Sequence, residues 1–159
     1  MQGTAIYPGT FDPITLGHLD LVQRASKIFS RVILAFATEG KSTMFSLDER
    51  MAMARESLPG VENVEIESFD GLLMKYARER GVHVIVRGIR AYSDFEFEFQ
   101  MALTNRKLAP DVETMFLMPN EAYGYLSSSL VREVAKLGGD TSDFVSGPVQ
   151  QRLDRLGAG

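Results

Sequence analysis

The chain has 159 residues, of which 45% are hydrophobic and 24% are charged, so its length and composition fit one compact globular domain over residues 1–159. The formal net charge of −4 argues against a nucleic-acid partner, because non-specific DNA binding needs a dense field of Lys and Arg. The absence of cysteine excludes disulfides, thiolate chemistry and cysteine-based zinc sites.

The N-terminal segment shows no targeting pattern. Residues 1–13 (MQGTAIYPGTFDP) have neither a basic segment nor an apolar one, and no apolar run approaches the roughly 18 residues of a membrane span. We therefore expect a cytoplasmic protein without membrane contact.

Short runs rich in Val and Ile alternate along the chain with longer, helix-like segments. This alternation predicts an α/β fold in which a single doubly wound, five-stranded parallel sheet of the Rossmann-like kind is covered on both faces. The predicted strands are residues 4–7, 31–37, 63–67, 82–86 and 113–118.

Helix-start chemistry marks the segments between the strands. Ser46 with Glu49, and Ser93 with Glu96, each match a capping box. Residues 95–99 (FEFEF) alternate as a strand would, but the capping pattern and the need for a crossover favour a helix. The predicted helices cover residues 17–29, 47–57, 70–80 and 94–107, then run from Ser128 or Ser129 to Lys136, with a short last one opening at Gly147-Pro148.

The first predicted strand leads into YPGTFDPITLGH, residues 7–18. Gly9 permits close backbone approach, Thr10 offers a hydroxyl and an N–H, and the helix that follows directs free N–H groups to the same place. His18 adds a directed donor. Each residue alone suits an ordinary turn, but together they predict an anion site at the carboxyl edge of the sheet, where open α/β sheets bind ligands.

The pattern G-T-F-D-P-x-T-x-G-H at residues 9–18 resembles the signature of nucleotidyltransferases that share a histidine motif with class I aminoacyl-tRNA synthetases. Over nearly its full length the chain resembles the bacterial phosphopantetheine adenylyltransferases. That resemblance implies a nucleotidyltransferase fold and transfer of AMP from ATP to 4'-phosphopantetheine, giving dephospho-coenzyme A and pyrophosphate. It implies that Thr10, Phe11 and His18 contact ATP, that Thr10 also binds the acceptor and takes part in catalysis, and that His18 stabilises the transition state.

Residues 35–42 (AFATEGKS) end like a P-loop, but Ala35 replaces its first glycine and the capped helix begins only at Ser46, too late for Ser42 to hold a metal. A solvated loop lysine is the default interpretation of Lys41. The resemblance instead implies that Lys41 binds the phosphate of pantetheine and takes part in catalysis.

The fourth predicted strand runs into Arg87-Gly88-Ile89-Arg90. Arginine forks suit phosphate oxygens, and a glycine between them permits close approach of a base or ribose. The resemblance implies that Arg87 binds the acceptor phosphate and that Gly88, Ile89 and Arg90 bind ATP, with Arg90 also catalytic.

The segment after the fifth predicted strand places three serines at a helix start, which by itself is equally consistent with an ordinary N-cap. The resemblance implies that this whole segment binds ATP: Tyr123, Gly124, Tyr125, Leu126, Ser127, Ser128 and Ser129. It also implies an ATP contact for Glu98, otherwise a plain helix acid, and a place for Leu73 in the pantetheine channel, otherwise a core residue.

The attacking group of this reaction is already an ionised phosphate, so positioning and charge stabilisation suffice for catalysis. No cluster of carboxylates suggests a metal site, so we expect Mg²⁺ to be held mainly by substrate phosphates. The resemblance also implies a homohexamer and feedback inhibition by coenzyme A.

Two other interpretations compete. Relatives that adenylate nicotinate mononucleotide or transfer CMP to glycerol phosphate typically carry H-x-G-H, where this chain has Thr15. A nucleotide-binding regulatory protein without turnover is the second, and the intact Thr10, His18, Lys41 and Arg90 argue against it.

Overall fold

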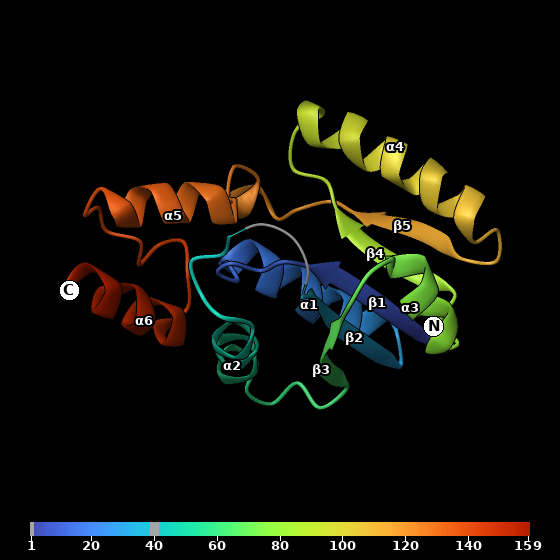
Figure 1. The fold of residues 1–159 in the computed structure, drawn as a ribbon, viewed down its shortest axis with the longest axis horizontal. Coiled ribbons are helices and arrows are strands. Elements are labelled where there is room, and N and C mark those ends of the chain that lie inside the picture. The colour runs from blue at the N-terminus through green and yellow to red at the C-terminus, as the bar shows by residue number, and fades with distance from the viewer. Residues whose placement is uncertain (1, 39–41) are drawn as a thin grey trace.

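The structure is a computed structural model and describes residues 2–38 and 42–159. Its centre is a parallel sheet of five strands in the order β3-β2-β1-β4-β5 (Figure 1). The strands are β1 (Thr4–Gly9), β2 (Arg31–Ala37), β3 (Val64–Phe69), β4 (Val84–Gly88) and β5 (Glu113–Leu117). The predicted five-stranded parallel sheet is confirmed.

The strand order places a topological switch point between β1 and β4. The chain moves outward from β1 through β2 to β3, then returns to pair β4 with the other side of β1, with Ile6 opposite Ile85. In open parallel sheets such a point leaves a crevice at the carboxyl ends of the two central strands. The loops after Gly9 and Gly88 both open into this crevice.

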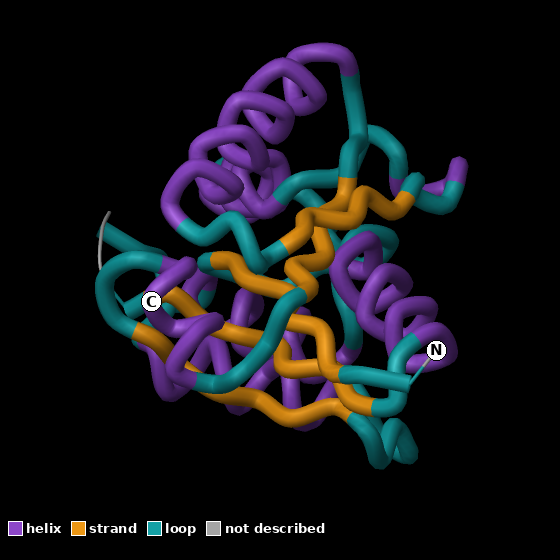
Figure 2. The backbone as a smooth tube through the Cα atoms, turned by 90° about the vertical axis from the view of Figure 1, so that its right-hand side faces the viewer, coloured by secondary structure: helices purple, strands orange, loops and turns teal. Residues whose placement is uncertain are grey.

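Helices cover the two faces of the sheet unequally, as the end view in Figure 2 helps to show. Successive residues of a strand point to opposite faces, so Ala5 and Tyr7 pack in one core while Ile6 packs in the other. The larger core also takes α1 (Leu16–Ile28), α2 (Leu47–Ser57), α5 (Ser128–Lys136) and α6 (Gly147–Gly157), and the smaller core takes α3 (Leu73–Glu79).

The longest helix, α4 (Tyr92–Leu108), barely covers the sheet. Figure 1 shows it beside β5 and apart from the other helices. Its apolar side chains are between 41% and 60% exposed at Phe95, Phe97, Phe99, Met101 and Leu103. The prediction of a helix across residues 95–99 is confirmed, but its apolar residues face outward.

The two predicted capping boxes have different outcomes. Ser46 caps α2, where its hydroxyl accepts from the Glu49 N–H at 3.2 Å and the Glu49 carboxylate accepts from the Ser46 N–H at 2.9 Å. The prediction at Ser93 is wrong, because α4 begins at Tyr92 and its N-cap is Ala91, without a side-chain cap. An ion pair from Arg90 to Asp94 spans the start of α4.

A short 3-10 helix (Glu121–Tyr123) precedes α5 and was not predicted. Within residues 2–38 and 42–159, no helix has the length and apolar character needed to cross a bilayer.

Candidate active site

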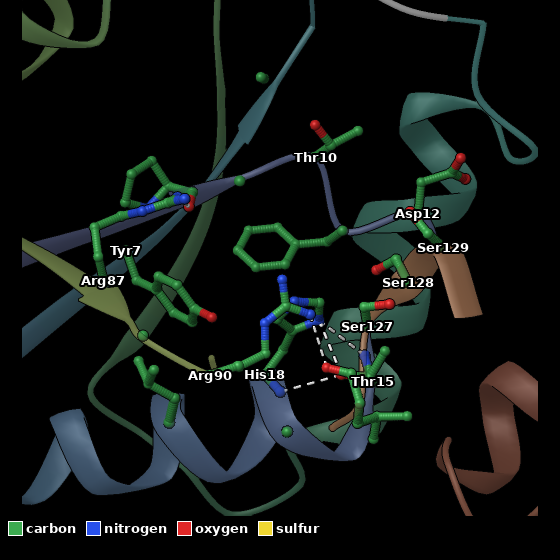
Figure 3. Close-up of a pocket in the computed structure, with 18 of the residues that line it drawn as sticks. Tyr7, Thr10, Asp12, Thr15, His18, Arg87, Arg90, Ser127, Ser128 and Ser129 are labelled. Atoms are coloured by element: carbon green, nitrogen blue, oxygen red, sulfur yellow. Dashed lines mark hydrogen bonds between the residues drawn. The ribbon is translucent and has the colours of Figure 1, made fainter. Parts of the chain in front are cut away.

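A cavity of about 530 Å³ lies at the crevice between the carboxyl ends of β1 and β4 (Figure 3). Its walls come from the loop after β1, the first turns of α1, the end of β4 and the start of α5. These segments are far apart in sequence, and the topology of the sheet brings them together.

The start of α1 fixes the histidine of the cavity. Thr15 is the N-cap of α1, and its hydroxyl accepts from the His18 N–H at 3.3 Å. The imidazole reciprocates, because Nδ1 of His18 accepts from the Thr15 N–H at 3.0 Å. His18 therefore plays the part that Glu or Gln has in an ordinary capping box, and the ring proton is left on Nε2.

The electrostatics of the cavity keep this imidazole neutral. Burial, with smaller contributions from the positive charges of Arg90 and Arg87, lowers the pKa of His18 from 6.5 to about 3. At neutral pH His18 is thus a neutral N–H donor directed by its own helix cap.

The aromatic ring of Phe11 packs against the histidine. Phe11 has a φ of 50°, a left-handed conformation that is uncommon for a bulky residue. Its ring lies edge-on to His18 with centroids 5.1 Å apart. A Cβ on Gly9 would meet that ring at 2.8 Å, so only glycine fits there.

The guanidinium of Arg87 is held on two sides. It forms a two-pronged pair with the carboxylate of Glu98 on α4, and its Nη1 donates to the Pro8 carbonyl at 2.8 Å. Burial alone would lower the pKa of Arg87, but the hydrogen-bonded Glu98 raises it above its ordinary value. Arg87 therefore stays charged at the junction of β1 and β4, and Glu98, which holds it there, also lines the cavity.

Two further arginines donate hydrogen bonds that connect the walls of the cavity, including the segment that contains the serines. Arg90 donates from Nη1 to the Leu126 carbonyl at 2.7 Å. Arg132 donates from Nη1 to the Asp12 carbonyl at 2.6 Å and from Nη2 to the Ser129 hydroxyl at 3.2 Å. Both leave other N–H groups for a ligand.

The serines themselves have distinct positions. Ser127 is the N-cap of α5 and accepts from the Leu130 N–H at 3.1 Å, and Ser128 donates to the Pro13 carbonyl at 2.7 Å. Together with Ser129 they line the cavity at the start of α5. Hydroxyls and free N–H groups at a helix N-terminus form an anion site.

The cavity gathers most of the residues predicted from the sequence, namely Thr10, Phe11, His18, Arg87, Gly88, Arg90, Glu98, Tyr123, Leu126, Ser127, Ser128 and Ser129. Ile89, Gly124 and Tyr125 are near it in sequence but do not line it. Lys41 lies outside the described residues.

The sequence analysis assigned no role to several lining residues, among them the polar residues Asp12, Thr15, Arg50 and Arg132. Asp12 and Thr15 lie inside the turn that was singled out, and Arg132 follows the serine run by three residues, so proximity to a motif was the available signal. Arg50 had none, because a lone arginine in a helix is usually a solvated residue.

Positive charge is concentrated in the cavity although the chain is acidic. Among the described residues, four arginines and three carboxylates line the cavity, whereas the whole chain carries −4. Residues 2–38 and 42–159 contain no group of three or more Asp, Glu or His placed to hold a metal. The cavity is thus equipped for phosphate groups.

A second hollow of about 200 Å³ opens beside the first. The two share a wall at Thr10, Ala37 and Arg87. Leu73, assigned to the pantetheine channel by resemblance, lies here together with Phe69, Phe97, Met101, Ala102 and Asn105. Its lining is mainly apolar, with Asn105 as a polar group.

Comparison with known proteins agrees with this geometry. The cytidylyltransferase-like family matches residues 6–134, and the chain belongs to it. A putative nicotinate-nucleotide adenylyltransferase from Vibrio parahaemolyticus has the same fold, with a TM-score of 0.72 at 20% identity over 99% of this chain and 94% of its own. A bifunctional NMN adenylyltransferase/ADP ribose pyrophosphatase from Francisella tularensis gives a TM-score of 0.75 at 15% identity, and this chain covers 50% of it. Fold and site therefore define a nucleotidyltransferase.

A narrower family follows from sequence identity. A phosphopantetheine adenylyltransferase of Methylococcus capsulatus is 59% identical over 160 residues, covering 100% of this chain and 99% of its own. The chain belongs to the phosphopantetheine adenylyltransferases.

Proposed function

We propose that the protein transfers the adenylyl group of ATP to 4'-phosphopantetheine, releasing pyrophosphate and forming dephospho-coenzyme A. The observation that carries the proposal is the apolar hollow that opens from the phosphate cavity at Thr10 and Arg87. A phosphorylated acceptor with a long, flexible arm fits two such joined spaces, with the phosphate at the junction and the arm beside Leu73.

In the proposed reaction a phosphate oxygen of the acceptor attacks the α-phosphorus of ATP. A phosphorus–oxygen bond forms to the acceptor as the bond to the pyrophosphate breaks. Thr10, Lys41 and Arg87 orient the attacking phosphate, and the Nε2–H of His18 donates to an α-phosphate oxygen as negative charge builds there. Arg90 and residues 127–129 hold the leaving pyrophosphate, and Arg132 supports this arrangement from the neighbouring turn.

We further propose that Mg²⁺ enters with the phosphates of ATP. Asp12 is the carboxylate beside the serine segment, but its oxygens accept from the Met44 and Phe45 N–H groups at 2.7 and 2.9 Å. The donor set of the described cavity thus suits a metal held by phosphate oxygens and water. When bound, Mg²⁺ would neutralise charge on the leaving pyrophosphate.

Self-association is also part of the proposal. Helix α4 exposes a row of large apolar side chains, and exposed rows of this kind mark interaction surfaces. We propose that copies of the chain meet along α4 in the homohexamer that the resemblance implies. Coenzyme A, which contains the product, is proposed to compete for the same two hollows, and the cytoplasmic location stays a prediction.

The test is to incubate the purified protein with ATP, Mg²⁺ and 4'-phosphopantetheine and to follow pyrophosphate and the adenylated thiol by chromatography and mass. Nicotinate mononucleotide with ATP, and glycerol phosphate with CTP, serve as parallel acceptors. Stoichiometric dephospho-coenzyme A supports the proposal. Product from a parallel acceptor alone overturns the choice of substrate, and tight ATP binding without any product favours a regulatory protein.

A further inference from the structure

Arg50 on α2 is a buried arginine at the edge of the cavity. Its side chain comes up from the first turn of α2 behind the loop that carries Thr10, and only 3% of the residue is exposed. Arginine is almost never this buried without a partner of opposite charge. The position of Arg50 therefore calls for an explanation.

The cavity arginines differ in their ion pairs. Arg87 pairs with Glu98, Arg90 with Asp94, and Arg132 lies 3.9 Å from Asp12. Within residues 2–38 and 42–159, no carboxylate lies within 4.0 Å of the Arg50 guanidinium. The charge of Asp12 acts on Arg50 from a greater distance, but Asp12 is also the carboxylate beside Arg132, so Arg50 has no close ion pair of its own among the described residues.

The hydrogen bonds of Arg50 are incomplete as well. Nη1 donates to the carbonyls of Thr10 and Ala37 at 2.7 and 3.4 Å. Nε is buried without an acceptor among the described residues. Nη2 has no protein acceptor among the described residues either, and it is not one of the fully buried unpaired atoms, so it is available to a ligand in the cavity that Arg50 lines.

The position of Arg50 indicates which of the two substrates it would contact. Thr10 and Ala37, whose carbonyls it holds, belong to the wall shared by the cavity and the apolar hollow. The serine segment, assigned to the phosphates of ATP, lies at the start of α5 instead. An anion at the junction is the acceptor phosphate rather than a phosphate of ATP.

We propose that Arg50 is a phosphate-binding residue for the acceptor: its Nη2 donates to the terminal phosphate of 4'-phosphopantetheine, whose negative charge compensates the buried guanidinium. This inference rests on the proposed function and adds a residue to it. The alternative is a purely structural arginine that braces the Thr10 loop through the two carbonyls.

The test compares Arg50→Met, which keeps most of the stem and removes the charge, with wild type. Calorimetry measures binding of 4'-phosphopantetheine, of pantetheine without the phosphate, and of ATP. Loss of a hydrogen bond to a charged group predicts about 10- to 100-fold weaker binding of 4'-phosphopantetheine. Binding of pantetheine and of ATP is expected to change less than about 3-fold. The matched control is Arg55→Met on the exposed part of the same helix, which leaves all three affinities unchanged.

Equal losses for the three ligands would overturn the inference in favour of the brace, and an unchanged affinity for 4'-phosphopantetheine would overturn it outright. If Arg50→Met fails to fold, Arg50→Lys replaces it. Its shorter ammonium cannot reach the two carbonyls and the phosphate together, so a loss of about 3- to 10-fold confined to 4'-phosphopantetheine is expected, and any wider loss contradicts the inference. Wild-type turnover is measured first: absence of dephospho-coenzyme A would overturn the proposed function, whereas normal turnover with an Arg50-independent affinity would overturn this inference alone.

Discussion

The cavity and the outer face of α4 differ in how far their side chains find partners within the chain. In the cavity, donor side chains are fixed by hydrogen bonds within the same chain, as neutral His18 is by Thr15 and charged Arg87 is by Glu98 and Pro8. On α4 large apolar residues such as Phe97 and Leu103 have exposures of 60% and 52%. The donors named in the cavity have partners within the chain, whereas these apolar side chains of α4 are largely exposed in it.

The difference teaches which properties a single chain determines. Donors fixed in advance cost no reorganisation when charge develops on a bound phosphate, so the chemistry depends on contacts within the chain. Burial of apolar surface away from water is favourable, so contact with a second apolar surface would stabilise the outer face of α4. Glu98 connects the two regions, since it sits on α4 and holds Arg87.

The largest effect is expected from His18→Ala. Removing one fixed donor should lower kcat about 100- to 1000-fold, which corresponds to about 3 to 4 kcal/mol, with ATP affinity little changed. Rapid-quench turnover and ATP calorimetry measure the two quantities. The control is His83→Ala, because His83 is exposed, lies outside the cavity and has its imidazole beside Asp111. If ATP binding collapses while turnover per bound complex persists, His18 holds the nucleotide and does not act in the transition state.

A smaller effect is expected from Leu103→Glu on α4, which lines neither hollow. Placing a carboxylate in an apolar contact should weaken self-association about 10- to 100-fold, through the cost of burying an unpaired polar group. Light scattering across a concentration series measures the change. Leu137→Glu is the control, because Leu137 is 82% exposed beyond α5. An assembly that survives Leu103→Glu and dissociates with Leu137→Glu would place the interface elsewhere.

The next prediction compares the N-cap of α1, in which His18 takes part, with the ordinary N-cap of α2. Thr15→Ala and Ser46→Ala each remove an N-cap hydroxyl and should each lower the free energy of unfolding by about 1 kcal/mol. Only Thr15→Ala should also lower kcat, by less than about 10-fold, because the variant loses the hydroxyl beside His18 but the backbone N–H of residue 15 still donates to Nδ1 of His18. Chemical denaturation and steady-state kinetics on both variants measure this. An equal fall in kcat for both would show that helix stability, not the orientation of His18, limits the rate.

The caps also show what could be predicted from the sequence. Helix α2 was placed at its observed bounds, residues 47–57, because Ser46 and Glu49 form the pair that the pattern predicts. The same pattern failed at Ser93, because α4 already begins at Tyr92 and has Ala91 as its N-cap. The cap of α1 was not predicted, because a histidine in the place of Glu is not part of that pattern.

The remaining gaps concern tertiary contacts. The predicted strands meet at one edge because the sheet is parallel, so Thr10, His18 and Arg87 could be grouped from sequence. The burial of Arg50 could not, because it depends on how α2 packs behind the Thr10 loop. The outward face of α4 could not either, since the spacing of Phe95, Phe99 and Leu103 is the same for a helix facing a core.

The smallest expected effect concerns pH. Titration of His18 should add no pH dependence to kcat near neutral pH. With a pKa lowered to about 3, the imidazole is neutral on both sides of pH 6.5, so the ratio of wild-type to His18→Gln kcat should vary less than about 2-fold between pH 5.5 and 8. A cationic His18 would instead make that ratio fall as the pH rises through 6.5. Stability gives an independent reading: the unfolded chain takes up a proton below pH 6.5 and the folded chain does not until about pH 3, so His18 lowers wild-type stability as the pH falls through that window. The stability of His18→Gln relative to wild type should therefore increase from pH 7 to pH 5 in chemical denaturation, and a constant difference would mean that the folded imidazole titrates normally.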